Sequence, residues 1–420
     1  MSAAKPLSLA LYAGATAAIS PLAPLILNGR ARRGNEDVSR ITERLGRASA
    51  ARPDGPLAWL HGASVGEGLA LLPIIDRFRE LRPDVGVLVT TGTRTSAEIL
   101  RSRLPAGAVH QFAPVDTPGA VERFMGHWRP DLGVFVESEL WPNLIGRAKA
   151  SGARLALVSA KMSEASFRSW RRFPRAVAAI LDAFDVILAR DEAAGARFAA
   201  LGGRLNGIWD AKLGAPPLPA DEVELASLRS ALAGRQVILA ASTHPGEEAL
   251  IVRAFAGVVR QDALLVLIPR HPARGAEAVD SARAEGLTVA RRSTGESPAG
   301  AAVYVADTLG ELGLFYRLAR VAIVGGSLVE GVGGHNPLEP ARLGCPFVAG
   351  PHVDHWPIYG DFLSAEAARR IDGAEDLARV MSEALSGGLT DMARRATEIA
   401  RRRDEDNQAL APRLLALLDR

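Results

Sequence analysis

The chain has 420 residues, of which 48% are hydrophobic and 23% are charged, and its formal net charge is +3. These values describe a folded protein long enough for two domains, and they exclude a largely disordered chain. The small net charge and the absence of a basic arm give no indication of a nucleic-acid partner. Cys345 is the single cysteine, so an intramolecular disulfide and a multi-thiol metal site are excluded.

The N-terminal stretch 6–29 contains no charged residue, and a cluster of three arginines follows it within 30–33. A signal peptide is disfavoured because the region before the stretch is weakly basic. Pro21 and Pro24 interrupt a transmembrane helix. We therefore expect an anchor embedded in a membrane, with the arginines on the cytoplasmic side. A buried helix of the first domain is the competing interpretation.

Short apolar runs then alternate with amphipathic stretches. Continuously apolar strands separated by helices predict a parallel sheet covered on both faces. The expected strands are Leu57–Leu60, Val85–Thr90, Leu132–Val136, Leu155–Ser159 and Val186–Leu188, and the expected helices are Gly68–Glu80, Ser96–Arg103 and Trp141–Ala150.

Three prolines within residues 214–221 predict a linker, after which the alternation starts again. Two doubly wound α/β domains are therefore expected, with ligands at the carboxyl ends of the strands and in a cleft between the domains. The tail from Leu377 is expected to be helical. The strands expected in this half are Val237–Ala240, Leu264–Ile268, Ala302–Val305, Val321–Val324 and Pro346–Ala349.

The segment 323–339 is the most informative about function. A β-branched run leads into a loop with five glycines, and a helix is expected to open at Asn336. Asn336 suits the N-cap, Pro337 the first helical position and Glu339 the end of a capping box. Glycines admit a close ligand, and a helix start favours an anion such as a nucleotide phosphate. A strand-to-helix turn without a ligand is the alternative.

Acidic side chains follow two expected strands of the first half. Glu67 lies at a helix start, where it either acts as a general base or complements the helix dipole. Glu137 and Glu139 follow the strand Leu132–Val136, and Glu137 is favoured as the functional carboxylate because Glu139 suits a helix start. Ser64 lacks the Gly-x-Ser-x-Gly context of a hydrolase nucleophile.

In the second half, Arg270 lies between two prolines on a short turn, in the order Pro269-Arg270-His271-Pro272. Such an arginine is suited to bidentate binding of a phosphate or carboxylate. His352, Asp354 and His355 suggest a metal site, but no further strong ligands accompany them, so no metal is expected.

Together these motifs resemble the 3-deoxy-D-manno-octulosonate (Kdo) transferases over nearly the whole chain. The resemblance implies a GT-B fold, with two Rossmann-like doubly wound α/β domains facing across a cleft and an N-terminal membrane anchor. The implied parts are an anchor at 1–33, an acceptor domain at 34–213, a linker at 214–221 and a CMP-Kdo donor domain at 222–420. The motifs are Ser64-Val-Gly-Glu67, Glu137-Ser-Glu-Leu-Trp-Pro-Asn143, Pro269-Arg-His-Pro272, Gly310-Glu-Leu312 with Tyr316, and Gly325-Gly-Ser327 through His335-Asn-Pro-Leu-Glu-Pro340.

The resemblance also implies a reaction: inverting transfer of Kdo from CMP-Kdo to the lipid A precursor (lipid IVA) at the cytoplasmic face of the inner membrane, without a cofactor or metal. Glu67 matches the general base. Glu137 matches a position that stabilises the transition state, and Lys212 is aligned with another. The segments that contact CMP are matched by Pro269, Arg270, Gly310, Glu311, Leu312, Asn336, Pro337, Leu338 and Glu339.

Two alternatives stay open at this point. One is a GT-B transferase that uses a UDP-sugar on another lipid or glycan, because it shares the fold and the phosphate site at a helix start. The other is a non-catalytic protein that binds a sugar nucleotide. The presence of both Glu67 and Glu137 argues against the second.

Overall fold

The computed structural model describes residues 6–214, 216–258 and 260–419, apart from the side chain of Lys212. The chain forms two compact units, Met1–Ala215 with Asp404–Arg420 and Pro216–Arg403. The division falls inside the proline-rich segment 214–221. Residues 404–420, expected in the second domain, belong instead to the first unit.

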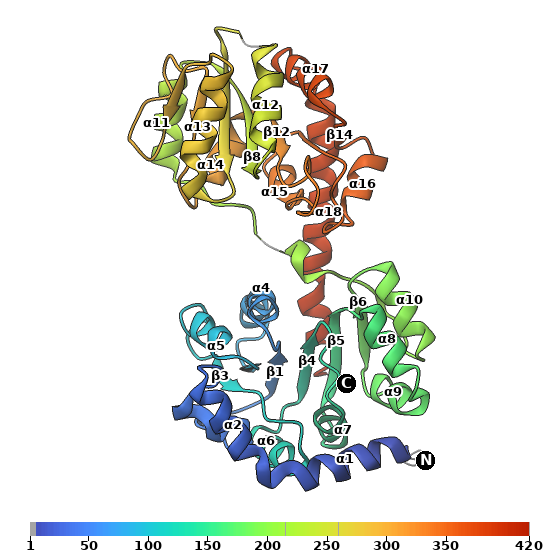
Figure 1. The fold of residues 1–420 in the computed structure, drawn as a ribbon. Coiled ribbons are helices and arrows are strands. Elements are labelled where there is room, and N and C mark those ends of the chain that lie inside the picture. The colour runs from blue at the N-terminus through green and yellow to red at the C-terminus, as the bar shows by residue number, and fades with distance from the viewer. Residues whose placement is uncertain (1–5, 215, 259, 420) are drawn as a thin grey trace. The chain divides into compact units, whose positions relative to one another are not determined.

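The first unit contains a seven-stranded parallel sheet in the order β3-β2-β1-β4-β5-β6-β7. Figure 1 shows helices on both of its faces. The strands are β1 Leu57–His61, β2 Gly86–Thr91, β3 Val109–Phe112, β4 Leu132–Val136, β5 Arg154–Ala160, β6 Val186–Ala189 and β7 Gly207–Ile208. The helices are α1 Leu7–Ile19, η1 Ser20–Leu22, α2 Ala23–Arg32, η2 Val38–Arg40, α3 Ile41–Arg44, α4 Val65–Leu81, α5 Arg94–Arg101, α6 Pro118–Trp128, α7 Pro142–Ala150, α8 Glu164–Trp170, α9 Pro174–Leu181, α10 Glu192–Ala200 and η3 Ala211–Gly214.

The second unit repeats the architecture with the strand order β10-β11-β9-β8-β12-β13-β14. Its strands are β8 Gln236–Thr243, β9 Ala263–Pro269, β10 Val289–Arg291, β11 Val303–Val305, β12 Ala319–Val324, β13 Phe347–Ala349 and β14 Arg369–Arg370. Its helices are α11 Glu222–Leu232, α12 Glu247–Ala256, η4 Pro272–Arg274, α13 Gly275–Ala284, α14 Leu312–Leu318, α15 Leu338–Arg342, α16 Tyr359–Ser364, α17 Ala374–Leu385 and α18 Thr390–Leu415, whose last turns enter the first unit. The predicted pair of doubly wound α/β domains is confirmed.

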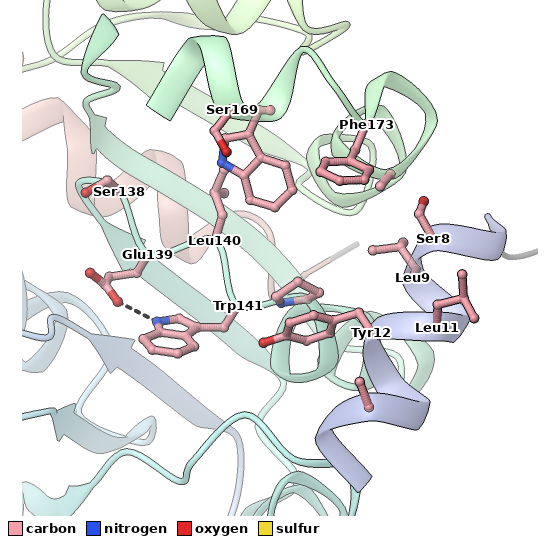
Figure 2. Close-up of a pocket in the computed structure, with 14 residues that line it drawn as sticks. Ser8, Leu9, Leu11, Tyr12, Ser138, Glu139, Leu140, Trp141, Ser169 and Phe173 are labelled. Atoms are coloured by element: carbon pink, nitrogen blue, oxygen red, sulfur yellow. Dashed lines mark hydrogen bonds between the residues drawn. The ribbon is translucent and has the colours of Figure 1, made fainter. Parts of the chain in front are cut away.

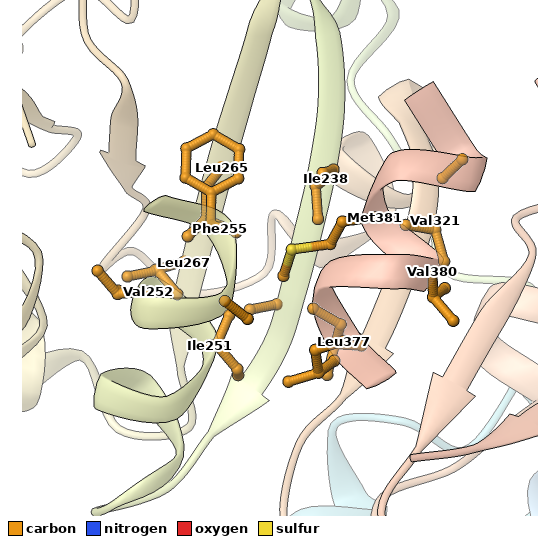
Figure 3. Packing of buried hydrophobic residues seen from close by; sticks show 14 of the residues in the cluster. Ile238, Ile251, Val252, Phe255, Leu265, Leu267, Val321, Leu377, Val380 and Met381 are labelled. Atoms are coloured by element: carbon orange, nitrogen blue, oxygen red, sulfur yellow. The ribbon is translucent and has the colours of Figure 1, made fainter. Parts of the chain in front are cut away.

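The core of the second unit explains why its strands are continuously apolar. Side chains of β8 and β9 pack against those of α12 and α17, as Figure 3 shows for Ile238, Leu265, Phe255 and Met381. All four of these side chains are fully buried. Because helices cover both faces of a parallel sheet, its strands carry apolar residues at successive positions rather than at alternate ones.

The N-terminal apolar stretch forms helices α1 and α2, and short η1 joins them at Pro21. Among the described residues, Leu7–Arg32 is the segment long and apolar enough to cross a membrane, with a mean hydropathy of 1.6, and only 6% of its most apolar window is buried. Two polar contacts hold α1 on the first unit: Tyr12 Oη donates to Asp116 Oδ2 (3.0 Å), and Asn143 Nδ2 donates to Thr16 Oγ1 (3.0 Å). The helix is thus a possible anchor that is also attached to the folded body.

Candidate functional site

Glu67 lies in the first turn of α4, directly after β1, and only 8% of the residue is exposed. Its Oε2 accepts the backbone N–H of Ala63 (2.7 Å), and its Oε1 accepts the hydroxyl of Ser64 (3.0 Å). The Ser64 hydroxyl in turn caps the helix by accepting the N–H of Glu67 (3.3 Å). The Ser-x-x-Glu spacing therefore forms a capping arrangement that fixes the Glu67 carboxylate at the carboxyl end of the strand.

Glu137 and Glu139 lie in the loop after β4, on the adjacent strand of the sheet. Glu137 has a left-handed backbone with φ of 64°, a strained conformation for a residue other than glycine, and such residues concentrate at functional sites. Its carboxylate forms an ion pair with Lys161. Glu139 accepts the indole N–H of Trp141. The topology thus brings the start of α4, with Glu67, and the loop of Glu137 and Glu139 to the carboxyl ends of two neighbouring strands.

The pKa of Glu67 reflects its burial and the charges of its two acidic neighbours. Burial raises the pKa of Glu67, and the charges of Glu139 and Glu137 raise it further, against the hydrogen bonds from Ala63 and Ser64. Burial also opposes the ionised form of Glu139. However, contacts with His61, Trp141 and Lys161 outweigh it, and the pKa of Glu139 is lowered. Glu67 therefore binds a proton more readily than an ordinary glutamate, as a general base requires.

A buried hydrogen-bond chain lies beneath Glu139. Trp59 Nε1 donates to Thr90 Oγ1 (2.8 Å), and Thr90 Oγ1 lies 2.9 Å from His61 Nδ1. If the Thr90 hydroxyl donates to Nδ1, the imidazole proton is on Nε2, which lies 3.9 Å from Glu139 Oε2. The core thereby orients His61 toward the acidic loop.

The glycine-rich loop of the second unit was expected to offer free N–H groups to an anion, but part of it does not. The carboxylate of Glu247, which is fully buried, accepts the backbone N–H groups of Gly326 (2.8 Å), Ser327 (3.1 Å) and Leu328 (2.9 Å), and also that of His244 (2.8 Å). These N–H groups are already occupied within the protein. This part of the loop is held by an internal carboxylate and does not present free donors to an anion.

The helix after the loop also begins later than expected. Helix α15 starts at Leu338 with Pro337 at its N-cap, whereas Asn336 was expected there. Asn336 still caps the turn, because its Oδ1 accepts the N–H of Leu338 (3.1 Å). Burial raises the pKa of Glu339 to about 7, although Arg270, Arg342 and Asn336 act in the opposite direction. Arg270 and the segment Asn336–Glu339 therefore lie within electrostatic reach of each other.

Two histidines from different loops meet beside this segment. His244 Nε2 lies 2.9 Å from His335 Nε2, and the two rings are stacked with an interplanar angle of 19°. Burial lowers the pKa of His244, and burial with the charges of His244 and Arg270 lowers that of His335 to about 4. Both rings are neutral at pH 7, and a single proton bridges the two nitrogens.

The third segment that was predicted to contact CMP, Gly310-Glu311-Leu312, forms the turn before α14. Gly310 adopts φ of 82°, which favours glycine, and Glu311 is the N-cap of the helix. The Glu311 carboxylate is engaged by Arg292 and Thr308, which lower its pKa. Its side chain is therefore committed to contacts within the protein.

Lys212 lies in η3, and its side chain is outside the described residues, so its role stays a prediction. Among the residues that the structure describes, no group of three or more His, Cys, Asp and Glu side chains is arranged to hold a metal ion. The sequence did not indicate that the Glu247 carboxylate accepts N–H groups about 80 positions away, or that His244 and His335 meet. No local pattern marks contacts of such separation.

Comparison with known proteins identifies the family. Residues 39–211 match the family model described as 3-deoxy-D-manno-octulosonic-acid transferase (kdotransferase). The probable mitochondrial 3-deoxy-D-manno-octulosonic acid transferase of Arabidopsis thaliana is 38% identical, and the match covers 82% of this chain and 80% of that protein. The 3-deoxy-D-manno-octulosonic acid transferase of Bordetella pertussis is 36% identical, over 86% of this chain and 88% of that protein.

A solved glycosyltransferase from Rickettsia africae has the same fold, with a TM-score of 0.55, 11% identity, and coverage of 87% of this chain and 98% of that chain. Two parallel seven-stranded sheets and these relatives agree with the fold and family suggested by the motifs. The chain belongs to the 3-deoxy-D-manno-octulosonic acid transferase family and is a glycosyltransferase with the GT-B fold.

Proposed function

We propose that the protein transfers Kdo from CMP-Kdo to a hydroxyl of the lipid A precursor, lipid IVA, with inversion at the anomeric carbon. The observation that carries the proposal is the buried Glu67 carboxylate, whose pKa is raised by burial and by two neighbouring carboxylates. A carboxylate whose pKa is raised binds a proton more readily than an ordinary glutamate, which suits a general base. Membership of the Kdo transferase family indicates that the transferred sugar is Kdo.

In this reaction the acceptor hydroxyl gives its proton to Glu67 as its oxygen attacks the anomeric carbon. The bond from that carbon to the phosphate oxygen breaks, and CMP leaves from the opposite face, which inverts the configuration. The sugar centre gains positive charge in the transition state, so the negative charge of Glu137 would stabilise it. By family resemblance, Lys212 would balance the charge that develops on the departing phosphate.

We assign the donor to the second unit, at Pro269-Arg270, Gly310–Leu312 and Asn336–Glu339. The exposed guanidinium of Arg270 is suited to the phosphate of CMP. Because the pKa of Glu339 is raised to about 7, this side chain can take up a proton when an anion binds nearby. It can then serve as a hydrogen-bond donor instead of repelling the phosphate.

We also propose that α1 and α2 place the protein on the cytoplasmic face of the inner membrane. Leu7, Leu25 and Ile26 are 74%, 69% and 52% exposed, and the arginines of 30–33 follow them. Deletion of residues 1–29 is expected to move the protein from the membrane pellet to the supernatant. Unchanged sedimentation would contradict this assignment.

The test of the function uses the purified full-length protein in detergent with EDTA. It is given lipid IVA together with either CMP-Kdo or a UDP-sugar. We expect release of CMP and a Kdo-modified lipid from the first donor alone. Turnover of the UDP-sugar with no use of CMP-Kdo would overturn the donor assignment, and a requirement for added divalent metal would overturn the metal-free mechanism.

A further inference from the structure

The first unit contains an apolar pocket of about 660 Å³ that the reaction proposed above does not use. Helix α1, the loop after β4 and the segment from α8 to α9 form its walls, as Figure 2 shows. Its volume is in the usual range for small-ligand sites, roughly 300–1,000 Å³. The lining includes Leu9, Tyr12, Ala15, Trp141, Trp170 and Phe173.

One end of the pocket reaches the acidic loop. Glu139 and Trp141 both line it, and the indole N–H of Trp141 is bonded to the Glu139 carboxylate. Glu139 in turn interacts electrostatically with Glu67. A molecule that fills the pocket therefore has one end close to the carboxylates and the remainder among apolar side chains.

The walls of the pocket expose large apolar groups to solvent. Leu11 is 65% exposed, Phe173 52% and Trp141 42%. Tryptophan at such a position is typical of surfaces where protein meets the headgroup region of a lipid. The pocket thus combines a polar end, an apolar body and a rim suited to lipid.

We propose that this pocket binds an acyl chain of the lipid acceptor while the sugar of that acceptor lies at the acidic loop. The proposal rests on the lipid acceptor of the proposed function. Apart from Glu139, the lining carries no charged side chain, and its remaining side-chain polar groups are hydroxyls and indoles. A bound peptide would leave its backbone amides without enough partners, whereas an acyl chain has no polar groups to satisfy.

Ala15→Trp tests the proposal because it fills the pocket from α1, where residue 15 is exposed and a large side chain does not disturb the core. Ala17→Trp is the matched control: two positions along a helix correspond to a rotation of about 200°, which places the new side chain on the opposite face of α1. Phe173→Ala removes an exposed part of the wall and tests the same pocket by a change that adds no bulk.

Each protein is assayed in detergent with CMP-Kdo and two acceptors, lipid IVA and its fully deacylated sugar. The measured quantity is the ratio of kcat/KM for the acylated over the deacylated acceptor, and the deacylated acceptor also reports that each variant is folded. We expect the ratio to fall about tenfold in Ala15→Trp and in the same direction in Phe173→Ala, since two buried methylenes already correspond to roughly tenfold. We expect the ratio of Ala17→Trp to stay within about twofold of wild type.

Equal losses in Ala15→Trp and Ala17→Trp would overturn the proposal, because α1 would then act as a general lipid-facing surface. A wild-type protein that uses both acceptors equally well would also overturn it, while the proposed transfer would stand. Failure of the wild type with both acceptors would instead contradict the proposed function itself.

Discussion

Glu67→Gln separates the chemical role of this side chain from its role in the fold. The carbonyl oxygen of a glutamine can accept the N–H of Ala63, as Oε2 of Glu67 does at 2.7 Å. Its amide can donate to the hydroxyl of Ser64, whose oxygen lies 3.0 Å from Oε1. The helix cap therefore survives the substitution, and what is lost is the capacity to accept a proton.

The expected loss in kcat is about 10²–10⁴-fold, the usual contribution of a general base, or roughly 2.7–5.5 kcal/mol in the barrier. The stability of the folded protein, in contrast, is expected to stay the same or to rise. Because burial and two acidic neighbours raise the pKa of Glu67, the ionised form lowers the stability of the folded protein near pH 8. A neutral glutamine removes this cost, so Tm is expected to be equal to or above that of wild type.

The assay is release of CMP from CMP-Kdo with lipid IVA, with CMP-Kdo affinity and Tm measured on the same preparations. Glu98→Gln is the control, since Glu98 belongs to an exposed ion pair with Arg94 in the same unit and should leave all three quantities unchanged. Activity of Glu67→Gln within about threefold of wild type would refute the base assignment. A fall in Tm that parallels the fall in activity would show that the role is structural.

Three further predictions concern the carboxylates of Glu139, Glu247 and Glu339. Glu139→Gln removes a charge that raises the pKa of Glu67. The acid limb of the plot of kcat/KM against pH should therefore move to lower pH. An acid limb that stays in place or moves to higher pH would contradict this effect of Glu139 on Glu67. Glu247→Gln leaves an amide facing backbone donors, and urea unfolding should show a loss of roughly 3 kcal/mol or more, whereas the exposed control Glu277→Gln should change stability by less than about 0.5 kcal/mol. The pKa of Glu339 is raised from 4.5 to about 7, so wild-type stability should fall as pH rises through this interval. At about 1.4 kcal/mol per unit, Glu339→Gln should gain about 3 kcal/mol over wild type between pH 4.5 and 8, and parallel pH curves would refute this.

Much of the fold follows from local pattern, because buried parallel strands are uniformly apolar. The expected strand Leu132–Val136 matches β4, and the other expected strands differ from the observed ones by a few residues. Strand β3 was missed because His110 and Gln111 occupy it. These polar residues are accommodated by distant partners, since Gln111 accepts the indole N–H of Trp128 and His110 bonds to Thr91. Such contacts cannot be read from a window of neighbouring residues.

The same limit applies to the candidate site. The helix-start position of Glu67 and the loop of Glu137 were visible as strand ends followed by acidic residues, and the structure brings both to one edge of the sheet. The glycine-rich loop appeared open to an anion, but Glu247 from α12 accepts the N–H groups of Gly326, Ser327 and Leu328. Likewise, the tail from Leu377 was expected to be helical, yet nothing local showed that Leu410 and Leu414 pack into the first unit.

The most direct test of the account is the identity of the product formed from CMP-Kdo and lipid IVA. Mass spectrometry should show the acceptor enlarged by Kdo, and NMR should show that the new linkage has the anomeric configuration opposite to that of the donor. With Glu67→Gln the same product should be nearly absent although the donor still binds. A product with retained configuration, or free Kdo with unmodified lipid, would contradict inverting transfer with Glu67 as the base.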